Sequence, residues 1–153
     1  MKKYELTAEF IEKWGKKLFR IKALISFGSV EVGELGGYVE KEDNLAQDGN
    51  AWVYGNARVC GDAEVYGNAD YLLIGRIGSR FSFTTFFKNK DKGITVSCGC
   101  FLGTIAEFRA KVSDTHGNNK HAKIYNLAAD MAELQILGEE YFDKLNTNKS
   151  EPF

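Results

Sequence analysis

A segment with two arginines has the residue types and the spacing to bind an anion. It has two arginines four positions apart, a Gly-Ser pair between them and two threonines shortly after: Arg76, Gly78, Ser79, Arg80, Thr84 and Thr85. Glycine lets backbone N–H groups turn toward an anion, hydroxyls add donors, and a guanidinium offers paired N–H groups to a phosphate. The segment therefore predicts a site for a phosphate-bearing ligand, with His116 as a further contributor. A tight turn with two solvated arginines is the alternative interpretation.

Two cysteines and two histidines form a second candidate group. Cys98 and Cys100 are separated by one residue, and His116 and His121 follow. Thiolate and imidazole are ligands that tetrahedral zinc takes in proteins. Because Cys-x-Cys is a rarer chelating unit than Cys-x₂-Cys, a buried strand cysteine and two loop histidines are the simpler interpretation, and a Cys–His nucleophile pair is a third. We predict no catalytic residue, no resident metal and no cofactor, and we expect Cys98 and Cys100 to form no disulfide.

Aromatic rings cluster directly after the arginine segment. They are Phe81, Phe83, Phe86, Phe87 and Phe101. Near-alternating rings of this kind are typical of a hairpin that packs under helices. Because basic residues are interleaved with the rings, a stacking platform for bases is the alternative.

A six-residue pattern repeats four times over residues 49–72. Each hexad has Gly, then Asn or Asp, then Ala in fixed register, as in GNAWVY at residues 49–54. A fixed short period predicts a solenoid, here a left-handed β-helix in which Val53, Val59 and Val65 point inward. Roughly three hexads make one triangular coil, so four of them cannot bury their own core. An N-terminal cap, the following domain or another subunit must complete it.

Apolar side chains also occupy the position after each inward valine and the end of the last hexad. They are Tyr54, Cys60, Tyr66 and Leu72. Four outward apolar side chains in a row form a larger apolar surface than isolated residues do. The row therefore predicts burial against the C-terminal domain or a partner subunit. We therefore expect a homo-oligomer, either a dimer or a trimer.

The other segments predict short strands and two helices. Apolar residues from Phe10 to Phe19 recur at spacings of three and four, which predicts a short helix or turn, and residues 19–25 predict a strand. Residues 81–87 and 94–98 predict a hairpin. Thr104 and Glu107 form a capping box for a first helix. A second helix, from about residue 120 to 141, is expected to bury Ile124, Leu127, Ala128, Met131, Leu134 and Ile136 or Leu137.

The predicted fold class is therefore α+β. A short left-handed β-helix-like section with its N-terminal cap occupies residues 1–72, a small ββαα domain occupies residues 73–145, and a flexible tail occupies residues 146–153. The chain has 153 residues, which is enough for one domain or two very small ones.

Charge and hydropathy exclude several functional classes. The formal net charge is -1, so no global field attracts nucleic acid or a membrane, although residues 76–92 hold five basic residues and one acid. The first ten residues lack the apolar core of a signal peptide, and no apolar run approaches the length of a membrane span. We expect a cytoplasmic protein with reduced thiols that binds neither membranes nor specific nucleic-acid sequences.

Three segments resemble a family of small bacteriophage and prophage proteins of Firmicutes. They are residues 20–57, which precede GNA-x-V-Y hexads, residues 74–87, with IGRIGSRFSFTTFF, and residues 96–125. The resemblance implies a non-enzymatic accessory protein of the host bacterial cytoplasm. Small phage proteins of this kind often counter host defence, either by sequestering a nucleotide immune signal or by binding a host defence protein.

Hexads also occur in acyltransferases, which provide the enzyme alternative. Those enzymes use a long solenoid, usually trimeric, with a catalytic histidine at a subunit boundary. Here the repeats are few and neither His116 nor His121 lies within them. A structural or assembly protein of the virion is the third alternative.

Overall fold

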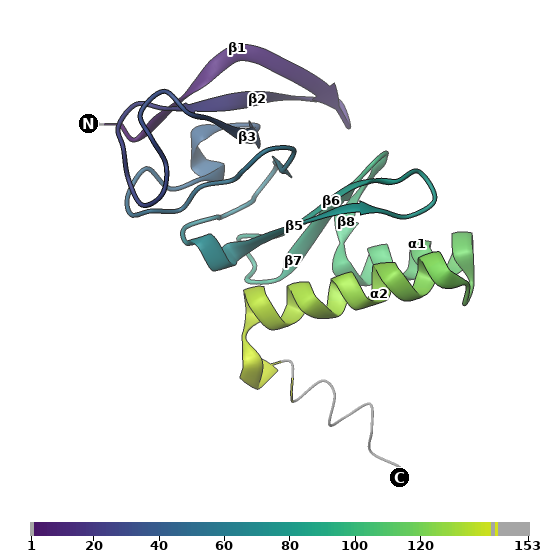
Figure 1. The fold of residues 1–153 in the computed structure, drawn as a ribbon. Coiled ribbons are helices and arrows are strands. Elements are labelled where there is room, and N and C mark those ends of the chain that lie inside the picture. Colours follow the sequence, from purple (N-terminus) through teal and green to yellow (C-terminus); the bar gives the residue numbers. More distant parts are fainter. Residues whose placement is uncertain (1, 142, 144–153) are drawn as a thin grey trace.

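A computed structural model describes residues 2–141 and residue 143, and shows a mixed α+β fold with two four-stranded sheets (Figure 1). The first sheet contains β1 (Tyr4–Lys13), β2 (Lys16–Ala23), β3 (Leu35–Val39) and β4 (Arg58–Val59). The second contains β5 (Tyr71–Ile77), β6 (Ser82–Lys88), β7 (Ile94–Cys98) and β8 (Phe101–Thr104). Two helices follow, α1 (Ile105–His116) and α2 (Lys120–Ala132), and then a π-helical turn, Glu133–Leu137. No helix in the described part of the chain is long and apolar enough to cross a membrane.

The N-terminal segment is a β-hairpin, so the prediction of a short helix near residues 10–19 is wrong and its alternative, a turn, is right. β1 and β2 pair antiparallel, with Phe10 opposite Phe19 and Ile11 opposite Leu18. The turn between them passes through Trp14, whose φ of 55° is left-handed. The three-and-four spacing therefore came from residues that meet across a hairpin. The predicted strand is confirmed as β2, shifted toward the N-terminus.

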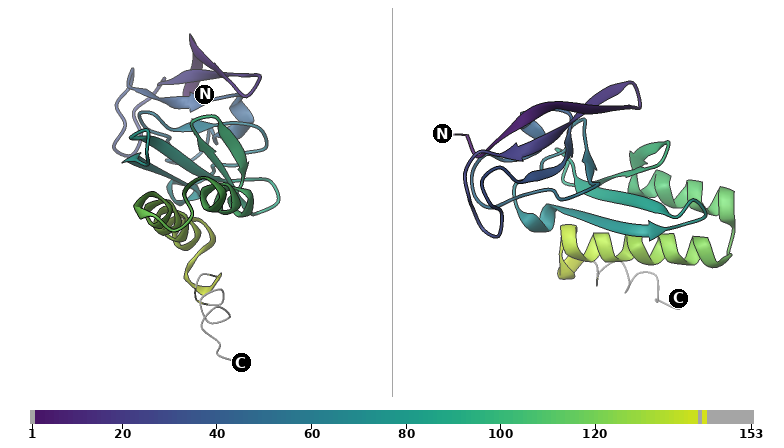
Figure 2. Two further views of the ribbon diagram at one scale, coloured as in Figure 1. Left: turned by 90° about the vertical axis from the view of Figure 1, so that its right-hand side faces the viewer. Right: turned by 45° about the horizontal axis from the view of Figure 1, so that its top comes forward.

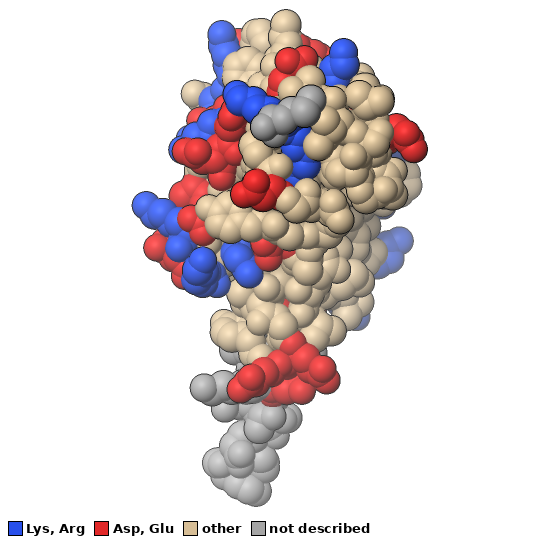
Figure 3. Space-filling view, turned by 90° about the vertical axis from the view of Figure 1, so that its left-hand side faces the viewer, with Lys and Arg blue, Asp and Glu red and all other residues tan. Residues whose placement is uncertain are grey.

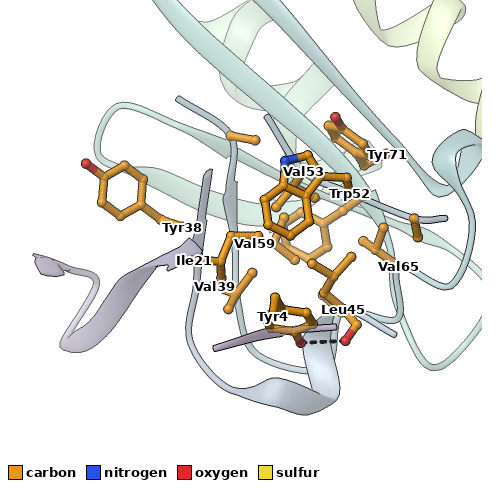
Figure 4. Packing of buried hydrophobic residues seen from close by; sticks show 14 of the residues in the cluster. Tyr4, Ile21, Tyr38, Val39, Leu45, Trp52, Val53, Val59, Val65 and Tyr71 are labelled. Carbon is orange, nitrogen blue, oxygen red and sulfur yellow. Dashed lines mark hydrogen bonds between the residues drawn. The ribbon is translucent and has the colours of Figure 1, made fainter. Parts of the chain in front are cut away.

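The hexads stack on the segment that precedes them. Tyr38 pairs in parallel with Arg58, Val39 with Val59, and Leu45 with Val65, each twenty positions further along the chain. All three inward valines, Val53, Val59 and Val65, are fully buried as predicted (Figure 4). Within the first three hexads, strand geometry is limited to Arg58–Val59, and β5 begins at Tyr71 in the fourth, so the left-handed β-helix stays a prediction.

The N-terminal cap completes the core that the hexads begin. Trp52 is the largest fully buried side chain, and the ring of Tyr4 lies edge-on to it at 6.2 Å between centroids. Lys3 is buried as well, and its Nζ donates a hydrogen bond to the carbonyl of Ala51 at 2.7 Å. Asn44 donates from Nδ2 to the carbonyl of Gly61 at 2.9 Å.

The predicted outer row does not form one buried face within the single chain. Tyr54 and Tyr66 are exposed, with 41% and 55% of their surface accessible. Cys60 is buried in the core of the first sheet, and Leu72 packs against the core of the second.

The second sheet has two more strands than the predicted ββαα unit. The expected hairpin is confirmed as β6 and β7, with Phe86 opposite Val96. β5 and β8 flank it in the order β5-β6-β7-β8. They are edge strands whose sequences, YLLIGRI and FLGT, lack a two-residue alternation, and so the pattern did not reveal them. The boundary expected after residue 72 falls within β5, and the tail at 146–153 lies outside the described residues.

Both helices cover one face of the second sheet (Figures 1 and 2). The predicted capping box is present, since Thr104 Oγ1 accepts from the Glu107 backbone N–H at 3.1 Å and the Glu107 carboxylate accepts from the Thr104 backbone N–H at 2.9 Å. α2 ends at Ala132 rather than near Tyr141, because the π-helical turn and Gly138, with φ 97°, interrupt it.

The buried face of α2 and the following turn agrees with the prediction only in part. Ala128 and Ile136 are buried as predicted, but Leu127, Met131 and Leu134 are exposed, and the other core residues are Ala122, Ala129 and Ala132. Arg109 on α1 donates to Asp130 at 2.7 Å and to Glu133 at 2.6 Å. These hydrogen bonds hold the polar side of α2 and of the following turn beside α1, and the alanines pack in the core with Phe86 and Val96 of the second sheet.

The second sheet is the middle layer of the molecule. Adjacent residues of β6 point to opposite faces, so Phe87 joins the core under the hexads and Phe86 joins the core under the helices. Backbone hydrogen bonds also link the layers, from Glu64 to the carbonyl of Lys88 at 2.8 Å and from Lys90 to the carbonyl of Asp62 at 3.0 Å. The hexads therefore lie directly on the sheet that carries the arginine segment.

Candidate anion-binding site

A cavity of about 360 Å³ lies where the hexads, the β1–β2 turn and the β5–β6 turn meet. Arg58, Arg76 and Arg80 all line it. Arg76 and Arg80 were predicted from the sequence, and Arg58 was not. The structure therefore brings three of the five arginines of the chain to one site.

Arg58 is fixed to the second sheet by two hydroxyl groups. Thr85 Oγ1 accepts a hydrogen bond from its backbone N–H at 3.1 Å, and Ser97 Oγ donates one to its carbonyl at 2.9 Å. Thr85 and Ser97 are paired neighbours on β6 and β7, and both are buried. Thr85 lines the cavity as predicted, and it also positions Arg58.

The β5–β6 turn presents the two predicted arginines. The guanidinium of Arg76 lies over the ring of Phe83, 5.5 Å from its centroid. A hydrogen bond of 3.1 Å from the Phe81 backbone N–H to the Gly78 carbonyl closes the turn. Gly78 has φ 85°, and a Cβ at this position would overlap the hydroxyl of Tyr125. Glycine is needed here so that the turn lies close against α2.

A second cavity of about 510 Å³ adjoins the first. Residues that line both include Arg58, Arg80 and Ser82. Ser79 and His116 line only the second cavity, so the predicted ligand residues are divided between the two. We call the two cavities together the arginine cleft.

Aromatic rings form one wall of the second cavity. The ring of His116 stacks on Tyr125 with 5.9 Å between centroids and an angle of 25°. Phe108 lies edge-on to Tyr125 at 5.6 Å, and Phe101 lies 5.7 Å from Phe108. Because these rings brace one another, the wall is held in place from α1, α2 and β8.

Thr84 lies outside the cleft. It is buried on the face of β6 opposite to Thr85, and its Oγ1 donates to Cys98 Sγ at 3.1 Å. Thr84 therefore contacts Cys98, which lines both cavities, but Thr84 itself lines neither.

The cleft is electropositive. Its two linings contain Lys13, Arg58, Arg76, Arg80 and Lys111, and they contain no Asp or Glu. No carboxylate in the described part of the chain lies within 4.0 Å of these five cations. By contrast, Lys and Arg lie among Asp and Glu along the left flank of the face in Figure 3. A concave surface lined by one sign of charge concentrates its field on a bound counter-ion.

Tyr125 keeps its proton at neutral pH. Burial raises the pKa of its hydroxyl to about 12, the neighbouring Cys98 adds to the increase, and Arg80 partly opposes it. The phenol is therefore a neutral hydrogen-bond donor beside the β5–β6 turn.

The alternative zinc site is not assembled in the described residues. No group of three His, Cys, Asp or Glu residues there could hold a metal ion. The rings of His116 and His121 lie 5.4 Å apart, but the cysteines do not join them. Cys98 and Cys100 are free thiols in this structure. No hydrogen bond in the described part of the chain joins Cys98 to either imidazole, so a Cys–His nucleophile pair is not formed there.

Comparison with known proteins adds no assignment: no protein-family model matches the chain, and no curated protein is significantly similar to it. The residues of the cleft are therefore the basis for a function.

Arg58 is the arginine of the cleft that the sequence did not indicate, and Lys13, Lys111 and Tyr125 were not indicated either. It occupies the variable fourth position of its hexad, where Trp52, Glu64 and Asp70 stand in the others. A single arginine at a variable position of a repeat does not indicate a binding site. Its role depends on contact with Thr85, 27 positions away in the sequence.

Proposed function

We propose that this protein binds a phosphate-bearing small molecule in the arginine cleft and releases it unchanged. The observation that carries the proposal is the set of five cations without a neighbouring carboxylate. Each hydrogen bond between a cation and a phosphate oxygen contributes about 1.5–3 kcal/mol, and guanidinium groups form such bonds in pairs. Hydroxyls of Ser79, Ser82 and Thr85 add neutral donors around them.

The resemblance to small phage proteins gives this binding a biological role. A protein that holds a nucleotide immune signal without converting it lowers the free concentration of that signal. We therefore propose phage counter-defence by sequestration, in the cytoplasm of the infected bacterium. Sequestration requires tight binding and a large number of copies, and it needs no catalytic group.

A thermal-shift screen tests this function. The ligands are pyrophosphate, cyclic dinucleotides, cyclic trinucleotides and ADP-ribose derivatives. We expect at least one of them to raise the unfolding temperature, because a ligand that binds only the folded state stabilises it.

Matched variants separate the cleft from general charge effects in the same screen. Arg58→Gln/Arg80→Gln should abolish the shift, whereas Lys22→Ala/Lys123→Ala removes the same charge from exposed sites and should retain it. If no ligand stabilises the wild-type protein, the proposal is wrong.

A further inference from the structure

We propose that the ligand is a nucleoside phosphate whose base lies in the second cavity, against Tyr125 and His116, and whose phosphates lie against Arg58 and Arg80. This inference rests on the proposed function and makes it more specific. It assigns a different ligand group to each part of the arginine cleft.

The two cavities differ in chemistry. The first is lined by arginines together with Asn56, Ser82 and Thr85, so its lining is mainly polar. The second is mainly apolar and contains Phe101, Phe108 and Val112 besides Tyr125 and His116. A ligand with one charged end and one flat apolar end would match this division. A nucleoside phosphate has both.

Aromatic residues of the first cavity are less suited to hold a base. The face of Phe83 is covered by the guanidinium of Arg76. The indole of Trp14 is tied down by its Nε1, which donates to the carbonyl of Cys100 at 3.0 Å. Phe81 projects into solvent with 66% of its surface accessible. A base would therefore gain little shelter there.

The second cavity offers a braced surface for stacking. His116 stacks on Tyr125 with 5.9 Å between centroids, and Phe108 lies perpendicular to Tyr125 at 5.6 Å, so a base would extend this stack from the ring of His116. Stacking on an aromatic side chain tolerates any base, because every base has a π face. The volume of about 510 Å³ is within the range of small-molecule sites, which is roughly 300–1,000 Å³.

The arrangement of the shared residues sets the orientation of the ligand. Arg58, Arg80 and Ser82 line both cavities, so a ligand that extends from one to the other must pass beside them. The phosphate closest to the sugar would meet Arg58 and Arg80, and a second phosphate would reach Arg76 in the first cavity. A diphosphate should therefore bind more tightly than a monophosphate.

Isothermal titration calorimetry with matched probes tests the inference. The probes are pyrophosphate, which has no base, and ADP, GDP and UDP, which share a diphosphate and differ in the base. We expect at least one nucleoside diphosphate to bind about tenfold more tightly than pyrophosphate, the usual gain from stacking one base. If all three bind no more tightly than pyrophosphate, base recognition is refuted and anion binding still holds. If neither pyrophosphate nor any nucleotide binds, the proposed function itself is wrong.

Substitutions of His116 locate the base. His116→Leu removes the ring and keeps an apolar side chain, whereas His116→Phe keeps a ring. The leucine variant should lose about tenfold in affinity for the nucleoside diphosphate, the phenylalanine variant should keep it, and pyrophosphate should bind both as it binds the wild type. If His116→Leu weakens pyrophosphate as much as the nucleotide, the base does not lie in the second cavity.

Discussion

The Thr85 hydroxyl accepts a hydrogen bond of 3.1 Å from the backbone N–H of Arg58, joining the hexads to the second sheet at the wall of the first cavity. Both layers must be in contact for Arg58 to reach the site, because it belongs to the hexads and Thr85 to β6. Their packing therefore sets the position of the third arginine.

Replacement of Thr85 by valine should weaken both stability and binding. The change keeps the shape of the side chain but leaves the N–H of Arg58 without an acceptor, which costs about 1–3 kcal/mol in the free energy of unfolding. Urea denaturation measures the stability, and calorimetry with pyrophosphate measures the affinity. Ser113→Ala, an exposed change on α1, is the control and should alter neither quantity. A Thr85→Val protein with wild-type stability and affinity would show that the hydrogen bond does not position Arg58.

Gly78→Ala should destabilise the protein through a specific clash with Tyr125. The added methyl group would overlap the Tyr125 hydroxyl, and φ is 85° at this position, so we expect a loss of about 2 kcal/mol or more. Gly55 also has a positive φ, 52°, but a Cβ there meets no atom within 4 Å, so Gly55→Ala should cost only about 1 kcal/mol for the left-handed backbone. Addition of Tyr125→Leu to the Gly78 variant should recover part of the loss. Equal losses for the two glycine variants would rule out the clash.

Stability should fall as the pH rises above 9. Burial raises the pKa of Cys60 from 9.0 to about 11 and that of Tyr71 from 10.0 to about 12, and it also raises the pKa of Tyr4 and Tyr125. The folded state keeps these protons where the unfolded state releases them, so their contribution is complete below pH 9 and is lost as the pH rises through the folded-state values. Burial lowers the pKa of Lys3, so this residue makes stability increase with pH, but it is one group against four.

Urea midpoints measured at pH 8, 9, 10 and 11 check this dependence. The midpoint should decrease steadily above pH 9, and Cys60→Ala should reduce the decrease between pH 9 and 11. A midpoint that stays constant over this range would mean that these groups are not buried as protonated species.

The protein should be a dimer or a trimer that uses the exposed face of α2. Leu127 and Met131 lie four positions apart on α2, Leu134 follows in the π-helical turn, and Leu127 has 65% of its surface accessible. Apolar residues at this spacing form one stripe on a helix, as in helix–helix contacts. Sedimentation at tens of micromolar should give a mass above the 17.1 kDa of one chain, and Leu127→Glu/Met131→Glu should return it to that value. Tyr54→Glu/Tyr66→Glu tests the outer row of the hexads instead. A wild-type monomer would refute the oligomer.

Local patterns in the sequence predicted local structure well. The six-residue period indicated which valines are buried, and the Thr104–Glu107 spacing identified the start of α1. Both predictions succeeded because the structure depends on residues that lie close together in the sequence. Arg76 and Arg80 line one cavity for a similar local reason, since only a short turn separates them; that this cavity binds a phosphate stays a prediction.

Features that depend on distant contacts were not predictable. Residues around Trp14 look helical by spacing, but their contacts run across the β1–β2 hairpin. The sequence indicated Leu127 as a core residue of α2, yet Arg109 on α1 fixes the helix with its alanines inward. Arg58 became a site residue only through its contact with Thr85. Each of these outcomes follows from a contact between separate segments, which a periodic pattern does not encode.

The affinity of the protein for pyrophosphate, measured by calorimetry with and without its cleft arginines, tests the central claim most directly. The wild-type protein should bind pyrophosphate, and Arg58→Gln/Arg80→Gln should bind it at least a hundredfold more weakly, because two charge-assisted contacts of about 1.5–3 kcal/mol each are lost. Lys22→Ala/Lys123→Ala should bind as the wild type does. Failure of pyrophosphate to bind the wild-type protein, or binding by the double arginine variant within threefold of the wild type, would contradict the account.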